Sequence, residues 1–151
     1  MADIVIRVEA TDFDLAAEYA RLAGRTDIGA IVQFIGRVRD RNNGQGVTRM
    51  TLEHYPGMTE KVLTDIAQRA CDRWQLQAVT IVHRIGPLQP ADQIVLVQTA
   101  SIHREHAFAA AEAIMDFLKS EAPFWKREDN DAGSRWVEAH AKDTAALQRW
   151  N

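Results

Sequence analysis

The stretch VTIVHRIGPLQPADQIVLVQTA, residues 79–100, decides the fold. Its two apolar runs, at residues 79–85 and 94–100, have the length and β-branched content of buried strands. The residues between them, 86–92, contain glycine and two prolines, which are typical of a turn. We therefore predict two strands joined by a short connection at the centre of the chain.

The sequence before this stretch alternates between strand and helix patterns. Short apolar runs predict strands at residues 4–8, 30–38 and 48–55. Thr11 or Asp12 is expected to cap a helix that runs to about Ala23 and stops at Gly24. Residues 40–46 are rich in Asn and Gly, so they predict a mobile hairpin loop. Apolar residues at four-residue spacing from Met58 to Trp74 predict an amphipathic helix.

After the central stretch, Ser101 is expected to cap a helix that ends before Pro123, because a residue preceding proline is disfavoured in helical geometry. Residues 124–128 and 135–139 flank a turn and predict a late β-hairpin. A short helix from about Asp143 is expected to close the chain. Strands and helices without strict alternation indicate one α+β domain over residues 1–151, with mixed or antiparallel sheets and packed helices.

Composition excludes several classes of protein. The chain has 18 Lys and Arg against 21 Asp and Glu, so it lacks the basic excess of a general nucleic-acid binder. Its first residues carry no apolar run after a basic start, which argues against export or a membrane span. The single cysteine, Cys71, excludes an internal disulfide and any cysteine cluster for a metal. These features predict a cytoplasmic protein.

Neither a glycine-rich phosphate loop nor a Gly-x-Ser-x-Gly or His-Glu-x-x-His motif is present, so a dispersed site is expected. His103 and His106 are spaced to share a metal, but the sequence indicates no third ligand. In FIGRVRD, residues 34–40, Arg37 and Arg39 would share one side of an extended chain and form an anion clamp. Spacing alone favours the alternative, a strand edge protected by charge.

Two lysines near Pro123 are the second candidate cluster. Lys119 follows Met115 by one helical turn, and Lys126 comes after the chain has turned back, so both ammonium groups are expected to face one pocket. In an extended segment Lys126 and Glu128 would share a side, with Arg127 on the other. The alternative for Lys119 is a cation that stabilises the C-terminal end of its helix.

Helix length separates these candidates. His103 and Lys119 are sixteen positions apart, which is about 24 Å along a helix axis. One small ligand cannot easily touch both residues of the same chain. If both serve one substrate, a second copy of the protein must supply one of them, and the site would lie at a dimer interface.

Several blocks resemble the signatures of the large-subunit family of molybdopterin synthase. They are LEHYPGMTEK at residues 52–61, HRIG at 83–86, SIHREHAF at 101–108, APFWKRE at 122–128 and RWVEA at 135–139. The resemblance runs from about Gly29 to Ala139. It implies an α+β fold like the α/β hammerhead, with a late β-hairpin subdomain. It also implies a sulfurtransferase without a bound cofactor or metal, active in molybdenum cofactor biosynthesis.

The family resemblance also implies the partners and the chemistry. Two large subunits would dimerise, and each would bind a small ubiquitin-like subunit whose C-terminal Gly-Gly ends in a thiocarboxylate. Two sulfur transfers would then convert cyclic pyranopterin monophosphate into the dithiolene of molybdopterin. No nucleic acid and no membrane takes part.

The resemblance assigns roles to individual positions of this sequence. Lys119 and Lys126 match the catalytic lysines of the family, and Phe34 and Met115 match residues beside the incoming tail. Lys119 would lie nearest the tail carboxyl, and Lys126 would orient substrate or assist proton transfer. The matches to substrate-binding positions are Arg37, Val38, Arg39, His103, Arg104, Lys119, Lys126, Arg127 and Glu128.

One departure and two other interpretations remain. His140 stands where some relatives are expected to have an arginine, and a neutral imidazole cannot reproduce a guanidinium fork. A non-catalytic adaptor could capture a protein tail by strand addition, although both lysines are present. A phosphate-binding hydrolase could use the same cations, but no nucleophile and base can be named.

Overall fold

The structure is a computed structural model that describes residues 2–42, 44–130, 133–137 and 146–150. Within these residues the chain forms two four-stranded sheets and one two-stranded sheet, together with three α-helices. This arrangement confirms the predicted α+β class with mixed and antiparallel sheets. His140 and the residues after Val137 in the RWVEA block lie outside the described residues.

The main sheet has the strand order β1-β6-β8-β2. β1 is parallel to β6, and the other neighbours are antiparallel. The second sheet has the order β10-β9-β5-β7 and is antiparallel throughout. The main-sheet strands are β1 (Asp3–Glu9), β2 (Ala30–Arg37), β6 (Ala78–Arg84) and β8 (Gln93–Ser101). Those of the second sheet are β5 (Arg49–His54), β7 (Gly86–Leu88), β9 (Phe124–Asn130) and β10 (Gly133–Val137).

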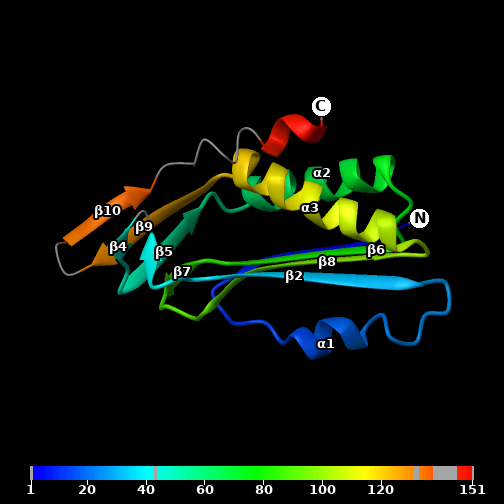
Figure 1. Ribbon diagram of the computed structural model, residues 1–151, viewed down its shortest axis with the longest axis horizontal. Helices are drawn as coiled ribbons and strands as arrows, with labels where there is room; N and C mark the ends of the chain where they lie inside the picture. The colour runs from blue at the N-terminus through cyan, green and yellow to red at the C-terminus, as the bar shows by residue number, and fades with distance from the viewer. Residues whose placement is uncertain (1, 43, 131–132, 138–145, 151) are drawn as a thin grey trace.

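The helices cover both faces of the main sheet. α2 (Met58–Arg73) and α3 (Arg104–Glu121) lie on one face and α1 (Leu15–Ala20) on the other, while the second sheet extends from one end (Figure 1). The largest core lies between the main sheet and the α2–α3 layer and includes Leu63, Ile66, Ile81 and Ile114. Because β6 and β8 are the central strands, their apolar runs are buried, as the sequence predicts.

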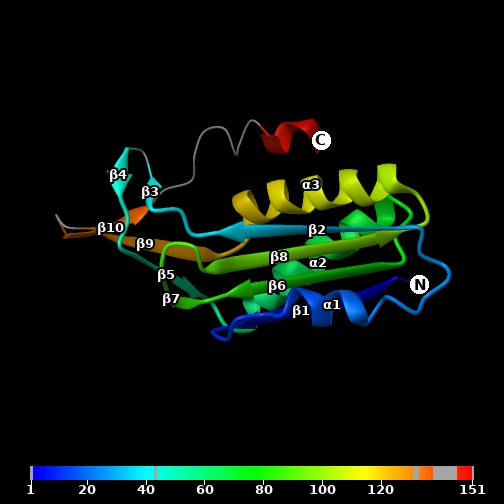
Figure 2. The same ribbon diagram turned by 60° about the horizontal axis from the view of Figure 1, so that its bottom comes forward.

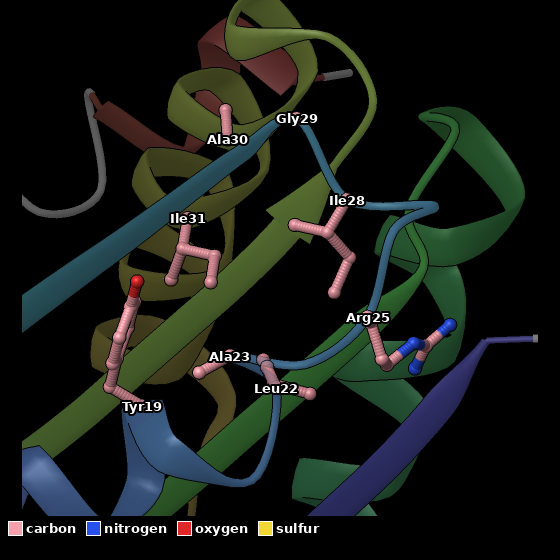
Figure 3. Close-up of a pocket in the computed structure, with 8 residues that line it drawn as sticks. All are labelled: Tyr19, Leu22, Ala23, Arg25, Ile28, Gly29, Ala30 and Ile31. Atoms are coloured by element: carbon pink, nitrogen blue, oxygen red, sulfur yellow. The ribbon is translucent and has the colours of Figure 1, made fainter.

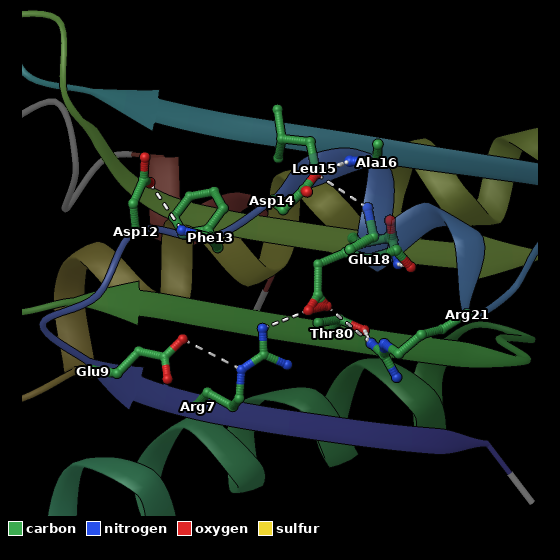
Figure 4. A network of polar contacts seen from close by, with 12 residues as sticks. Arg7, Glu9, Asp12, Phe13, Asp14, Leu15, Ala16, Glu18, Arg21 and Thr80 are labelled. Atoms are coloured by element: carbon green, nitrogen blue, oxygen red, sulfur yellow. Dashed lines mark hydrogen bonds and ion pairs between the residues drawn. The ribbon is translucent and has the colours of Figure 1, made fainter.

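A polar network fastens α1 to the main sheet. The buried carboxylate of Glu18 accepts hydrogen bonds from Arg7 on β1 and from Arg21 just after the helix (Figure 4). Arg21 also donates to the hydroxyl of Thr80 on β6 at 3.0 Å. The short helix therefore docks through paired charges as well as through the apolar contact of Phe13.

The predicted boundaries are wrong at three places. α1 is capped by Asp14, whose carboxylate accepts from the backbone of Ala16 and Ala17, and it ends before Gly24. α3 is capped by His103, because Ser101 is the last residue of β8 and its hydroxyl donates to the Gln75 carbonyl. The connection after β6 is not only a turn, since residues 86–88 form β7.

The remaining elements lie around the second sheet and α3. β3 (Arg41–Asn42) and β4 (Gln45–Gly46) form the hairpin predicted after β2. Figure 2 shows this hairpin standing over the second sheet. The described part of the expected C-terminal helix covers residues 146–150 and ends in the 3-10 helix η1 (Gln148–Trp150). The indole of Trp150 donates to Asp116, which holds η1 against α3.

Candidate active site

A tight reversal joins the two candidate lysines. α3 ends at Glu121 and β9 begins at Phe124, whose backbone N–H donates to the Ala122 carbonyl at 2.9 Å. Pro123 lies inside the reversal and has no N–H to extend the helix. Lys119, in the last turn of α3, and Lys126, near the start of β9, therefore lie on either side of one short turn.

Lys126 and Glu128 share one face of the second sheet. Lys126 lies opposite Leu52 in the ladder of β5 and β9, and Glu128 lies opposite Met50. Side chains directly opposite each other in an antiparallel pair project to the same face. Leu52 and Met50 form a buried cluster with Val38. The segment that follows β2 therefore packs on the face that carries Lys126 and Glu128.

This packing sets the positions of Arg37 and Arg39. Val38 is buried between them, and its N–H donates to the Asp92 carbonyl at 2.9 Å. The Arg37 guanidinium donates from two nitrogens to the Ala91 carbonyl, at 3.3 and 3.2 Å, so two of its donor groups are already engaged within the protein. Arg39 is exposed, and it forms no hydrogen bond or ion pair with any residue that the structure describes. Arg39 is therefore the more available of the two cations.

Glu128 is buried and faces the protein interior. Its Oε1 accepts a hydrogen bond of 2.6 Å from the side-chain amide of Asn42, and both residues are 4% exposed. Asn42 belongs to the hairpin that follows Arg39, so this contact holds the hairpin against β9. The geometry gives Glu128 a structural role beside the substrate-binding role expected from the sequence.

Arg127 projects to the other face of the second sheet. It alternates with Lys126 and Glu128 along β9, and its Nε lies 3.8 Å from the Asp129 carboxylate. Trp125, which shares its side of the strand, packs edge-on against Tyr55. Within one chain, Arg127 is therefore not brought together with Lys126.

His83 is a functional candidate that reasoning from the sequence missed. It lies at the end of β6 and its ring stacks on Phe124, with centroids 3.8 Å apart. Burial lowers the pKa of His83 to about 4, and the charges of Lys119 and His54 act in the same direction. The HRIG block contained this residue, but its spacing gave no sign of a ring contact 41 residues away in the chain.

Lys119 is exposed near the end of α3. No described residue accepts a hydrogen bond from its ammonium group or forms an ion pair with it. Its charge acts on the buried ring of His83, so the two groups lie in the same region. Lys119 therefore presents a cation at the junction of α3 and β9.

His103 and Arg104 lie at the opposite end of α3. His103 caps the helix and Arg104 is its first residue, whereas β9 leaves from the other end (Figure 1). Arg104 is exposed, and its nearest acidic contact is Glu105 at 3.8 Å. At about 1.5 Å per residue, the helix separates His103 from Lys119 by about 24 Å. A single chain does not bring these two groups together.

Phe34 and Met115 lie on the same side of the main sheet. Phe34 lies two residues after Val32 on β2, so both side chains project to the same face of the main sheet. Val32 packs against the core beneath the helices, and Phe34 is 41% exposed. Met115 is one helical turn before Lys119 and contacts the edge of that core. Because α3 packs on β2, both side chains face the region between these two elements.

A surface pocket elsewhere on the molecule contains no predicted site residue. Figure 3 shows this hollow of about 310 Å³ between α1 and the start of β2, on the face of the main sheet opposite α3. The charged residue in its lining, Arg25, is paired with Asp27 at 2.6 Å and with Asp3 at 2.7 Å. The pocket therefore offers no unpaired charge to a ligand.

Two features are absent from the residues that the structure describes. No group of three or more His, Cys, Asp or Glu side chains is placed to hold a metal ion. No helix there combines the length and the apolar character needed to cross a membrane.

Comparison with known proteins connects this geometry to one family. The profile of the MoaE protein family matches residues 8–121. The molybdopterin synthase catalytic subunit of Ralstonia nicotianae is 60% identical over 146 residues, covering 96% of this chain and 83% of the relative. The corresponding catalytic subunit of Escherichia coli is 51% identical over 99% of this chain and 100% of its own length.

A solved structure agrees with the sequence relatives. The molybdopterin biosynthesis MoaE protein from Burkholderia ambifaria superimposes with a TM-score of 0.83 at 53% identity, covering 99% of this chain and 98% of the other. The fold of two joined sheets is thus shared with that protein. The chain belongs to the MoaE protein family.

Proposed function

We propose that this chain is the catalytic subunit of molybdopterin synthase, a sulfur-transferring enzyme of molybdenum cofactor biosynthesis. Membership of the MoaE family and the names of its full-length relatives support this function. Three placements support the site: Lys119 lies in the last turn of α3, Lys126 lies near the start of β9, and Arg39 follows Val38, which packs on the face of the second sheet that carries Lys126.

The chemistry calls for cations at this place. The sulfur donor is the C-terminal thiocarboxylate of a small ubiquitin-like subunit, and the acceptor is cyclic pyranopterin monophosphate. Both reactants carry negative charge. The thiocarboxylate sulfur bonds to a carbon of the pterin side chain as an oxygen leaves that carbon, and water then cleaves the acyl–sulfur bond and frees the tail as a carboxylate. Both steps build negative charge on oxygen. Fixed ammonium and guanidinium groups stabilise such charge without needing to reorganise. Two successive transfers yield the dithiolene.

Each cation has a distinct role in the proposal. Lys119 is exposed and has no partner among the described residues, which suits a group that meets the incoming tail. Lys126 lies on the face of β9 next to the Val38 segment, where it orients the pterin or assists proton transfer. Arg39 holds the phosphate of the precursor with its guanidinium fork.

The tail of the small subunit is proposed to enter between β2 and α3. Phe34 offers an exposed aromatic ring on β2, and Met115 lies one turn before Lys119 on α3. An extended Gly-Gly terminus is thin enough to pass between such side chains and bring its thiocarboxylate to Lys119. The assembly would be a heterotetramer with two catalytic subunits at its centre.

A second protomer is proposed to complete the site. His103 and Arg104 match substrate-binding positions of the family but lie about 24 Å from Lys119 in the same chain. In a twofold-symmetric dimer, the start of α3 in one protomer can lie against the end of α3 in the other. By the same symmetry, Arg127, which projects away from Lys126 in its own chain, contributes to the site of the partner.

Product formation by a Lys119→Ala variant tests the proposed function. The chain is incubated with thiocarboxylated small subunit and the pterin precursor, and the dithiolene is measured. The native chain should form it, and Lys119→Ala should lose at least about 100-fold in rate, as expected when one charge-stabilising donor is removed. Its fold and its binding of the small subunit should be retained.

Lys61→Ala is the matched control, because Lys61 is an exposed lysine on α2. It should leave the rate unchanged. A native chain that captures the tail but forms no dithiolene would indicate the non-catalytic adaptor instead. Normal turnover by Lys119→Ala would remove Lys119 from the mechanism.

A further inference from the structure

Arg39 lies on a short segment whose backbone is fixed on both sides. Before it, the Val38 N–H donates to the Asp92 carbonyl at 2.9 Å. After it, the Asp40 carbonyl accepts a hydrogen bond of 2.7 Å from the Val47 N–H, where the hairpin of β3 and β4 closes. Because the guanidinium of Arg39 has no partner among the described residues, its position depends on these neighbours.

The hairpin is attached to β9 at two places. Just after the hairpin, the Thr48 N–H donates to the Asp129 carbonyl at 2.8 Å. Within the hairpin, the side-chain amide of Asn42 donates to Oε1 of Glu128 at 2.6 Å. Asn42 therefore ties the hairpin, through a side chain, to the strand that carries Lys126.

The contact between Asn42 and Glu128 is a costly way to hold two segments together. Both side chains are 4% exposed, and burying a carboxylate costs free energy even when it accepts a hydrogen bond. Apolar side chains of similar size could join the segments without that cost. A hydrogen bond, however, tolerates only a narrow range of lengths and angles, so it fixes where the hairpin lies along β9. The contact is therefore suited to alignment as well as to stability.

Alignment matters because two cations of the proposed site lie on the two sides of this contact. Arg39 is three residues before Asn42. Lys126 is two residues before Glu128 and projects to the same face of β9. A shift of the hairpin would move Arg39 relative to Lys126 without removing either charge. Such a shift, even of about 1 Å, is enough to misplace a bound substrate and slow its reaction.

We propose that Asn42 is a positioning residue of the sulfur-transfer site, which fixes Arg39 at the distance from Lys126 that the phosphorylated pterin requires. This inference rests on the proposed function and adds to it the group that aligns the phosphate-binding arginine. Asn42 is buried and touches neither the tail nor the pterin. Its loss should therefore weaken use of the precursor and leave capture of the tail unchanged.

A double-mutant cycle with Arg39 separates alignment from a general loosening of the fold. Asn42→Ala should lower kcat/KM for the precursor about tenfold, mainly through KM, because Arg39 is misplaced. If Asn42 acts through Arg39, adding Asn42→Ala to Arg39→Ala should lower kcat/KM by no more than about twofold further. Arg41→Ala, at an exposed position of the same hairpin, is the control and should leave kcat/KM unchanged.

The assay uses the chain with its thiocarboxylated small subunit, at a temperature where every variant remains folded. Losses that multiply in full in the double variant, or equal losses in Asn42→Ala and Arg41→Ala, would overturn the assignment of Asn42. The native chain run in parallel tests the proposed function separately. Its failure to form dithiolene would contradict that function, and the alignment by Asn42 would then be judged by hydrogen exchange.

Amide hydrogen exchange needs no turnover and measures the alignment in the chain alone. In Asn42→Ala the N–H groups of Val47 and Thr48 should exchange at least about tenfold faster than in the native chain, because the hairpin opens more often. The Val38 N–H, which is bonded outside the hairpin, should keep its native rate. Unchanged exchange at Val47 and Thr48, or an equal increase at Val38, would contradict the proposal.

Discussion

At the scale of single residues, the candidate site divides into cations that are available and cations that are already engaged. Arg39 and Lys119 have no partner among the described residues, whereas Arg37 donates to a backbone carbonyl. Lys126 and Glu128 each have contacts of their own within the protein. Charge alone therefore does not identify the groups that meet a substrate, since the geometry of their neighbours decides which remain free.

Arg39→Ala should weaken use of the phosphorylated precursor more than capture of the tail. A guanidinium that grips phosphate contributes about 1.5–3 kcal/mol, so kcat/KM for the precursor should fall about 10- to 100-fold. Affinity for the small subunit, measured by calorimetry, should stay within about twofold. Arg41→Ala is the control, because Arg41 is exposed and its guanidinium makes only a weak contact of 3.5 Å with the Gly44 carbonyl. Unchanged precursor kinetics would contradict the assignment of Arg39.

His83 should also control stability in acid. The pKa of His83 is lowered from 6.5 to about 4 in the folded chain, so the unfolded chain binds this proton first as pH falls. Stability is fully present above pH 6.5 and is lost progressively as pH falls through about 4, by up to about 3 kcal/mol.

Urea unfolding between pH 7 and pH 4 measures this loss. The native chain should lose more stability over the range than His83→Asn, which lacks the titrating ring. His103→Asn makes the same change at an exposed histidine and should behave like the native chain. Parallel curves for the native chain and His83→Asn would show that this histidine is not protonated on unfolding.

At the scale of secondary-structure elements, the sequence predicted most strands and helices but not their contacts. The apolar runs of β6 and β8 and the four-residue spacing of α2 were sufficient to locate these elements. β7 was missed because three residues that include a proline carry no periodic pattern. α1 was predicted too long because its docking depends on Glu18 and its partners on the sheet, which local capping signals do not reveal.

The candidate site was predicted unevenly for a related reason. The short spacing between Lys119 and Lys126 indicated that both flank one turn, and the structure agrees. The burial of Glu128 depends on Asn42, which is 86 residues away in the chain. No pattern within a single segment contains such a contact. Groups that position a site from other elements therefore become visible only in the fold.

The hairpin of β3 and β4 should be held in place by Asn42. Asn42→Ala removes the amide that donates to the buried Glu128 carboxylate. The loss of this hydrogen bond should lower the free energy of unfolding by about 1.5–3 kcal/mol. Asn42→Asp should cost more, because it places a second carboxylate beside Glu128. Chemical denaturation measures both variants. Asp40→Ala serves as the control, because Asp40 is an exposed residue just before the hairpin whose side chain has no hydrogen bond with a described residue. Native stability in Asn42→Asp would contradict the described contact.

At the scale of the whole molecule, the residues of the proposed site are divided between the two ends of α3. The second sheet, Lys119 and the Arg39 segment gather at one end, and His103 and Arg104 lie at the other (Figure 1). A long rigid helix cannot bend to bring these ends together. The proposed dimer resolves this separation, because each protomer then lends the start of its α3 to the site of its partner.

Mixed dimers test this shared site most directly. Lys119→Ala and Arg104→Ala subunits should each be nearly inactive as a homodimer. The two variants are given different tags and combined, and the mixed dimer is purified and supplied with thiocarboxylated small subunit and precursor. One of its two sites then contains both native residues, so dithiolene formation should return to about half of the native rate per dimer. A mixed dimer that assembles and stays inactive would contradict a site built from two protomers.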